Sequence, residues 1–152
     1  MIDDRVIVPV DEPTEWVAPM VVVPKPGQDS VRMCTDYTAL NKHVLREIHP
    51  MSTVESNFAA MGKGSVFSKI DVNSGFWQIP LSTASSKLTK FLSHKRRFWY
   101  LRLPQELNSS PKIFQAEMNR ILAGIDGVII HMDDVLVVGE DKAQHHESFN
   151  KF

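Results

Sequence analysis

Three aspartates, each beside a short apolar run, have the residue type and placement needed for cation chemistry. Asp133 and Asp134 stand side by side between two such runs, and Asp71 follows a third. Adjacent carboxylates in partly apolar surroundings repel one another unless a cation joins them. Oxygen ligands of this kind suit Mg²⁺, which keeps its other positions for water and substrate phosphates. The set is equipped for two-metal phosphoryl transfer, and the simpler interpretation is that these aspartates are turn and strand-end residues.

Apolar runs of strand length predict how the aspartates are positioned. Val128–Met132 and Val135–Val138 are separated only by the two adjacent aspartates, which predicts a tight hairpin with both carboxylates at its tip. Ser65–Ile70 predicts a strand that runs into the third aspartate. The sequence Asn73-Ser74-Gly75 then predicts a chain reversal, with glycine where the backbone approaches another group closely.

Other elements complete the predicted framework. The further strands are a hairpin of Val17–Pro24 with Val31–Thr35, and the pair Leu88–Leu92 and Phe98–Leu103. The helices begin with the capping box Ser52–Glu55, at Ser110-Pro111, and after the cap Asp141. A strand, a strand pair, a helix and a hairpin in this order predict an α+β fold with a split βαβ, ferredoxin-like sheet and helices on one face.

The composition fits one domain with an ordinary core. The chain has 152 residues, 43% of them apolar, and 17 Lys and Arg against 18 Asp and Glu. A formal net charge of −1 gives no global sign of a nucleic-acid or membrane partner. Residues 85–102, however, hold bases and no acid, so this stretch is a candidate surface for a phosphate backbone. Its bases are Lys87, Lys90, Lys95, Arg96, Arg97 and Arg102.

The cysteine content and the apolar runs exclude several classes of protein. Cys34 is the single cysteine, which excludes an internal disulfide and a zinc site built from several cysteines, and favours an intracellular location. The apolar runs fall far below the ~20 residues of a membrane-spanning helix. The acidic start at 1–5 lacks the apolar region of a signal peptide. We therefore expect no membrane partner.

Several blocks stand in a fixed order along nearly the whole chain, from Glu15 to Phe152. They include Arg32–Lys42 (RMCTDYTALNK), Phe67–Ile79 (FSKIDVNSGFWQI), Leu103-Pro104, Ser110–Gln115 (SPKIFQ) and His131–Asp134 (HMDD). In this order the blocks resemble the reverse transcriptases of Gypsy-type LTR retrotransposons and, more distantly, of retroviruses. The resemblance implies a single domain over 1–152, with fingers at roughly 15–65 and 85–103 and a palm at roughly 66–84 and 104–152. We expect the chain to stop before a thumb.

The resemblance also implies a catalytic centre. Asp71, Asp133 and Asp134 would be the catalytic carboxylates. Together with the carbonyl of Val72 they would hold two Mg²⁺ ions, for which Mn²⁺ is a possible substitute.

Nucleotide contacts follow from the same resemblance. Lys25 and Arg32 would close over the phosphates of the incoming nucleotide, and the alternative is that they are two solvated bases of a hairpin. The backbone amides of Ser74 and Gly75 would face the triphosphate.

Three further residues would contact the sugar or the primer. Phe76 would be the steric gate against a ribose 2′-hydroxyl, and the alternative is a core aromatic beside Trp77. Gln105 would touch the sugar of the nucleotide. Met132 would lie against the primer end.

The function implied by the resemblance is the RNA-directed DNA polymerase core of a retrotransposon pol polyprotein. Such a nucleotidyltransferase takes a dNTP and an RNA or DNA template with its primer, in the cytoplasm within a retroelement particle. The thumb, ribonuclease H and integrase regions of the polyprotein would lie outside this chain. We therefore expect the chain alone to polymerise poorly or not at all.

The chain departs from the family pattern at a few positions, which keeps an alternative open. Thr38 replaces the usual Arg, Glu106 the usual Gly, and His131 the commonest Tyr, while Lys95-Arg96 interrupt a turn. Glu106 places a negative charge beside a polyanion. The alternative is a catalytically inactive, retroelement-derived domain that binds nucleic acid or a partner. A weaker reading is a histidine metal site, for which the candidates are His131, His145 and His146.

Overall fold

The structure, a computed structural model, describes residues 1–24, 26, 27, 29–46 and 53–152. The chain divides into two compact units, the first made of residues 1–46 and 76–110 and the second of residues 47–75 and 111–152. The predicted limits of fingers and palm differ from these units and stay a prediction. Within the described ranges, no helix is long and apolar enough to cross a membrane.

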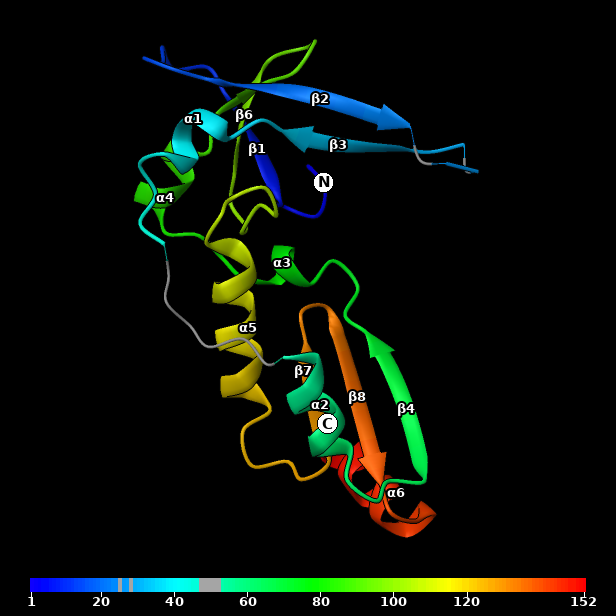
Figure 1. Cartoon of the computed structure of the whole chain (residues 1–152). Coiled ribbons are helices and arrows are strands. Elements are labelled where there is room, and N and C mark those ends of the chain that lie inside the picture. Colours follow the sequence, from blue (N-terminus) through cyan, green and yellow to red (C-terminus); the bar gives the residue numbers. More distant parts are fainter. Residues whose placement is uncertain (25, 28, 47–52) are drawn as a thin grey trace. The chain divides into compact units, whose positions relative to one another are not determined.

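The first unit contains a five-stranded sheet with the strand order β1-β6-β5-β2-β3 (Figure 1). Strands β2 and β3 pair antiparallel, which confirms the predicted hairpin, while β2 and β5 pair in parallel. The elements are β1 (Ile7–Val10), β2 (Ala18–Pro24), β3 (Val31–Thr35), α1 (Thr38–Asn41), α4 (Thr83–Leu88), β5 (Phe91–Leu92) and β6 (Arg97–Tyr100).

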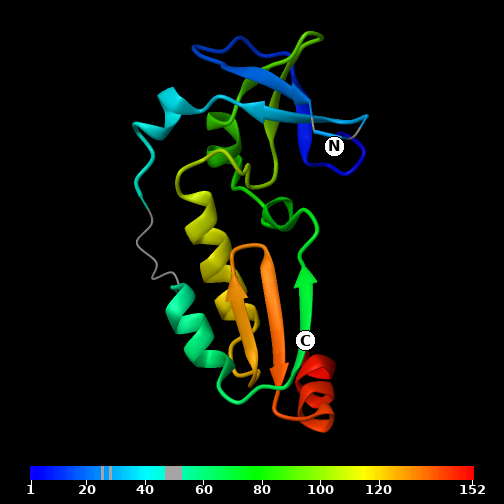
Figure 2. The same ribbon diagram turned by 45° about the vertical axis from the view of Figure 1, so that its right-hand side comes forward.

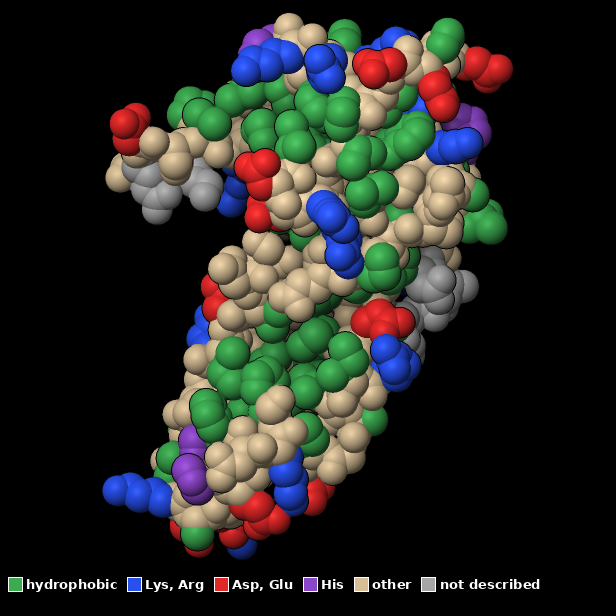
Figure 3. Space-filling model, turned by 180° about the vertical axis from the view of Figure 1, so that it is seen from behind, with side chains coloured by type: hydrophobic (Ala, Val, Ile, Leu, Met, Phe, Trp, Pro, Cys, Tyr) green, Lys and Arg blue, Asp and Glu red, His purple; other side chains and the backbone are tan. Residues whose placement is uncertain are grey.

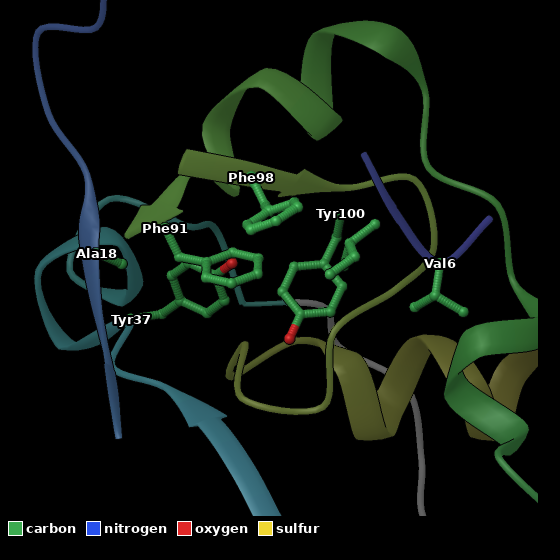
Figure 4. Packing of buried hydrophobic residues seen from close by; sticks show 7 residues of the cluster. Val6, Ala18, Tyr37, Phe91, Phe98 and Tyr100 are labelled. Carbon is green, nitrogen blue, oxygen red and sulfur yellow. The ribbon is translucent and has the colours of Figure 1, made fainter. Parts of the chain in front are cut away.

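Aromatic side chains form the core of this first unit (Figure 4). Phe91 packs against Phe98 and Tyr100, with ring centroids 5.7 and 5.2 Å apart. The hydroxyl of Tyr37 donates a hydrogen bond of 2.8 Å to the carbonyl of Thr89, so its buried oxygen has a partner. Burial raises the pKa of Tyr100 to about 12. The Tyr37 ring is therefore buried with its hydroxyl satisfied, whereas the buried Nε1 of Trp99 has no partner among the described residues.

The predicted strand at 88–92 is wrong in its first half. Leu88 is the last residue of helix α4, and strand β5 begins only at Phe91. The helix starts because the side chain of Ser82 caps it, accepting a hydrogen bond of 3.2 Å from the backbone N–H of Ser85. A short polar helix of this kind shows no apolar periodicity, so hydrophobic patterning misses it.

The second unit contains an antiparallel sheet with the order β4-β8-β7, and β8 lies between its two partners in both ribbon views (Figures 1 and 2). Val135 and Val137 of β8 are fully buried, as expected for a central strand. The α+β class is confirmed. The elements of the unit are α2 (Val54–Met61), β4 (Val66–Asp71), β7 (Val128–His131), β8 (Asp134–Gly139) and α6 (Lys142–Lys151). Two further helices begin at the boundaries between the units, the short helix α3 (Gly75–Gln78) and the longer helix α5 (Ser110–Ile121).

Side-chain caps start two helices of this unit. Thr53, not Ser52, caps α2, because its hydroxyl accepts a hydrogen bond of 3.1 Å from the N–H of Ser56. Ser52 itself lies outside the described residues. The carboxylate of Asp141 accepts from the N–H of Gln144 at 2.8 Å, which confirms the predicted cap of α6.

Candidate active site

The turn between β7 and β8 carries the residues of the predicted hairpin tip, shifted by one position. His131 pairs with Asp134, so the turn consists of Met132 and Asp133. Met132 has a φ of 53°, as the first position of some two-residue hairpin turns requires. The prediction that both aspartates form the tip is therefore wrong for Asp134, which is the first residue of strand β8.

Strand pairing brings the three aspartates to one end of the sheet. Asp71, the last residue of β4, is the register partner of Asp134 in β8. The next residue along, Val72, donates its N–H to the carbonyl of Asp133 at 3.0 Å. Residues far apart in sequence thus meet through main-chain hydrogen bonds and not through their carboxylates.

Asp133 has an unusual environment. Its Oδ1 is shielded from solvent and has no hydrogen-bond partner among the described residues. Burial raises the pKa of the Asp133 carboxyl above its ordinary value of 3.8, and the negative charges of Asp71 and Asp134 raise it further. A shielded oxygen without a donor, surrounded by like charges, is the environment that a bound cation would relieve.

Asp134 is instead engaged by a lysine. The Nζ of Lys69 lies 2.9 Å from its Oδ2, and both side chains are mostly exposed. The hydrogen bond and the charge of Asp134 raise the pKa of Lys69. Over the part of the chain that the structure describes, no three or more His, Cys, Asp or Glu side chains are arranged to hold a metal ion. The three carboxylates are neighbours, but their oxygens do not form a ligand set in this structure.

Among the described residues, His131, His145 and His146 do not form a metal-binding group either. The ring of His145 stacks on Phe149, with centroids 5.9 Å apart. His131 lies elsewhere in the second unit, where its Nδ1 is 3.4 Å from the side-chain nitrogen of Asn57.

The reversal after β4 is tight, as predicted, but its contacts are within the protein. A Cβ on Gly75 would lie 2.7 Å from the ring of Phe114, so only glycine fits here. The N–H of Gly75 donates to the carbonyl of Val72 at 3.2 Å. Ser74, with a φ of 54°, takes the left-handed conformation. In this structure the Gly75 amide is therefore used by the turn and not presented to a ligand.

The other predicted nucleotide contacts belong to the first unit. Arg32 and Gln105 line the same cavity of about 640 Å³, together with Glu106, Trp77 and Tyr100. The structure thus brings two predicted residues together that are distant in sequence.

Phe76, another predicted contact, is not among the residues that line this cavity. Phe76 is buried, with 9% of its surface exposed. Lys25 lies outside the described residues. A shared site that joins these residues to the aspartates stays a prediction.

Glu106 gives this cavity a half-buried carboxyl. Burial raises the pKa of Glu106, and hydrogen bonds from the backbone of Glu106 itself and of Thr35 oppose the rise. The carbonyl of Glu106 accepts a hydrogen bond of 3.0 Å from the side chain of Asn41. This residue is therefore held in place at the position where the family pattern has glycine.

The basic stretch 85–102 is only partly free to meet a phosphate backbone. His94, Lys95 and Arg96 are exposed in the turn between β5 and β6. Arg97 donates to the carbonyl of Asp11 at 3.3 Å, and Lys90 lies 5.9 Å from the ring centre of Trp99. Figure 3 shows Lys and Arg side chains along the upper edge of the view, with acidic side chains close by.

One residue that contacts the aspartate turn was not predicted from the sequence to have a function. Gln115 of helix α5 is 2% exposed, and its Oε1 accepts a hydrogen bond of 3.0 Å from the N–H of Met132 in the turn. The available signal was a polar residue on the apolar face of a helix, inside the SPKIFQ block.

Comparison with known proteins identifies the family to which this fold belongs. The family model "Reverse transcriptase (RNA-dependent DNA polymerase)" matches residues 23–152. The chain belongs to this family. Reverse transcriptases catalyse RNA-directed DNA polymerisation and generally depend on divalent metal ions.

Relatives of known origin agree with the Gypsy-type resemblance. The chain is 30% identical over 151 residues to the retrovirus-related Pol polyprotein from transposon opus of Drosophila melanogaster, matching 95% of this chain and 15% of that protein. It is 28% identical over 152 residues to the Pol polyprotein from transposon gypsy of the same species, matching 95% of this chain and 14% of that protein. The chain thus spans a small part of these polyproteins.

Solved structures confirm the fold. The prototype foamy virus protease-reverse transcriptase superposes with a TM-score of 0.88 at 26% identity, covering 99% of this chain and 20% of that chain. A foamy viral protease-reverse transcriptase in complex with double-stranded DNA superposes with a TM-score of 0.82 at 26% identity, covering 99% of this chain and 26% of that chain. The predicted reverse-transcriptase fold of fingers and palm is confirmed at this level.

Proposed function

We propose that this chain is the catalytic core of an RNA-directed DNA polymerase, which transfers a nucleotide from a dNTP to the 3′-hydroxyl of a primer. The observation that carries the proposal is the Oδ1 of Asp133, which is shielded and unpartnered among the described residues. Its carboxyl also has a pKa raised by burial and by two neighbouring aspartates. Such uncompensated charge costs stability and is typical of a site that binds a ligand.

Divalent cations, Mg²⁺ or Mn²⁺, fit the chemistry of this site, since its donors are carboxylate and carbonyl oxygens. Asp71, Asp133 and Asp134, with the carbonyl of Val72, would hold them, and Asp134 would exchange its contact with Lys69 for this role. Bound cations would supply charge neutralisation for the attacking hydroxyl and the leaving pyrophosphate.

The remaining roles concern the nucleotide. Lys25 and Arg32 would neutralise its phosphates, and Ser74 would present its amide to them. The Gly75 N–H would contact a phosphate only after releasing the carbonyl of Val72. A gating role against the 2′-hydroxyl falls to Phe76.

Contacts to the sugar and the primer complete the proposal. Gln105 would contact the sugar, and Met132 the primer end. A template with its primer, and the rest of a Pol polyprotein, would be the partners. The foamy viral structure with DNA supports a nucleic-acid partner for the family.

Incorporation of a single nucleotide tests the proposal. A DNA primer on an RNA template, with Mn²⁺ or Mg²⁺ and one dNTP, would be extended by the wild-type chain slowly and only at high protein concentration, because the chain alone is expected to polymerise poorly. Asp133→Asn should reduce the rate roughly 100-fold or more. The matched control is Asp126→Asn, which changes an exposed aspartate of the same unit and should leave the rate unchanged. Equal rates for wild type and Asp133→Asn would sink the proposal.

A second candidate function is nucleic-acid binding without chemistry. The ion pair between Lys69 and Asp134 favours a chain without chemistry, because it occupies a carboxylate of the cation site. Glu106 favours it too, because its half-buried carboxyl lines the same cavity as Arg32 and would repel the triphosphate of a nucleotide there. Thermal unfolding with Mn²⁺ and dNTP separates the two. A rise in melting temperature supports the polymerase, whereas no rise together with salt-sensitive RNA binding supports the alternative.

A further inference from the structure

Helix α5 supports the aspartate turn through one buried side chain. Gln115 is 2% exposed and uses both ends of its amide. Its Oε1 accepts from the N–H of Met132 at 3.0 Å. Its Nε2 lies 3.1 Å from the Oδ1 of Asn119 and 3.4 Å from the carbonyl of Ile130, and donates to both. The Gln115 amide therefore contacts the main chain on both sides of His131, at the end of β7 and in the turn.

The turn needs such support because its own residues do not favour its shape. Met132 has a φ of 53°, a region that residues with a Cβ avoid. Its side chain is 44% exposed, so packing holds it there only in part. The hydrogen bond from its N–H to Gln115 is thus a main restraint on this backbone conformation.

Asp133 depends on the same restraint. Its Oδ1 has no partner among the described residues, so that oxygen does not fix the direction of the side chain. The main chain around it is held from two sides, by Gln115 at the N–H of Met132 and by Val72 at the carbonyl of Asp133. The position of the carboxylate therefore follows from the position of the turn.

We propose that Gln115 is a positioning residue, which acts through the N–H of Met132 to place the carboxylate of Asp133 for cation binding. The inference rests on the proposed function and adds a residue to it. Because Gln115 contacts the main chain, its effect does not depend on the side chain at position 132. Loss of its acceptor should loosen the turn and weaken the cation site without unfolding the unit.

Gln115→Met tests this proposal, because methionine keeps the volume and apolar packing of the side chain and removes the acceptor. The control is Gln144→Met, which removes an exposed acceptor of the same chemical type, since the Oε1 of Gln144 takes a hydrogen bond of 2.7 Å from the N–H of Glu140. The probes are Mn²⁺ affinity and hydrogen exchange of the Met132 amide, both measured on the 152-residue chain.

We expect Gln115→Met to speed exchange at Met132 about 10-fold and to weaken Mn²⁺ binding about 10-fold to 100-fold. Gln144→Met should change neither quantity. Met132→Gly in the Gln115→Met background should restore most of the Mn²⁺ affinity, because glycine adopts the positive φ without help. Packing alone would predict no change in Gln115→Met and no rescue by glycine.

The outcomes separate this inference from the function on which it rests. Wild-type exchange at Met132 in a folded Gln115→Met chain overturns the inference, whatever the Mn²⁺ affinity. A lack of rescue by Met132→Gly also overturns it. If the wild-type chain binds no Mn²⁺, the proposed function fails, and faster exchange at Met132 still supports the restraint on the turn.

Discussion

The two ends of strand β8 show opposite solutions to the same problem of ending a central strand. At Gly139 the main chain packs closely, and a Cβ there would lie 2.5 Å from the backbone nitrogen of His145. The adjoining N–H of Glu140 is donated to a side chain at 2.7 Å. At the other end, Asp133 keeps a shielded oxygen with no partner among the described residues. The Gly139 end contributes stability, whereas the Asp133 end has a shielded charge that costs stability.

The largest expected change in the free energy of unfolding is at the Gly139 end of β8. Gly139→Ala should lower the free energy of unfolding by about 3 kcal/mol, because the added methyl group meets backbone that cannot move aside easily. Denaturation in urea measures this loss. Gly124→Ala is the control, since nothing lies within 4 Å of its Cβ position and only its φ of +85° is unfavourable. A loss of less than about 1 kcal/mol at Gly139 would show that helix α6 adapts and that the two ends are alike.

The next largest change in the free energy of unfolding has the opposite sign and lies at the Asp133 end of β8. Asp133→Asn should raise the free energy of unfolding by about 0.5 kcal/mol, because it removes a charge that Asp71 and Asp134 repel and that water only partly screens. The same substitution should reduce nucleotide incorporation roughly 100-fold or more. Higher stability with lost activity would mark a functional site, whereas lower stability would show that Asp133 has a structural role.

The difference in stability between wild type and Asp133→Asn should depend on pH. The folded chain holds the proton of Asp133 more tightly than the unfolded chain, since its pKa lies above 3.8 in the folded state. The destabilising contribution is therefore absent below this value and grows as the pH rises through the folded pKa.

Urea denaturation of wild type and Asp133→Asn from about pH 4 to pH 7 measures this contribution. The stability advantage of the variant should increase with pH. Glu106 has a pKa raised in the same direction, but it is present in both chains and cancels in the difference. An advantage that is constant across this range would contradict the assigned cause.

The smallest expected change is in Mn²⁺ affinity, on removal of the ion pair between Lys69 and Asp134. Lys69→Met should leave the melting temperature unchanged, because exposed ion pairs contribute little to stability. It should raise Mn²⁺ affinity about 3-fold, since a positive charge is removed from the neighbourhood of the carboxylates. Lys142→Met, at the start of helix α6, is the matched control for a lysine substitution near the opposite end. Weaker Mn²⁺ binding in Lys69→Met would mean that Lys69 orients Asp134 for the ion.

Local sequence signals predicted much of the second unit. The apolar runs and caps located β4, β7, β8 and the last helix to within a residue or two. The error at the hairpin tip has a physical cause, because apolar patterning fixes which residues form strands but not which residues turn. Met132 has no preference for a positive φ, so nothing in its type indicated that it, and not Asp134, belongs to the turn.

Contacts between segments that are distant in sequence cannot be predicted from local sequence signals. Strand β1 at Ile7–Val10 exists through its pairing with β6, and β5 through its parallel pairing with Ala18 and Pro19. Strand β6 ends at Tyr100 and not at Leu103. The contact of Gln115 with Met132 joins a helix to a turn 17 positions away. Such contacts depend on the packing of whole elements, which a single sequence does not specify.

The ion pair between Lys69 and Asp134 has a consequence for the charge at the aspartate site. Three aspartates crowded at one sheet end carry a charge of −3, and Lys69, bonded to Asp134 at 2.9 Å, reduces the local sum to −2. The chain therefore brings a counter-ion of its own, attached to β4 by a flexible side chain. Under the proposed function, a diffusible cation that binds the carboxylates would displace this tethered one from Asp134.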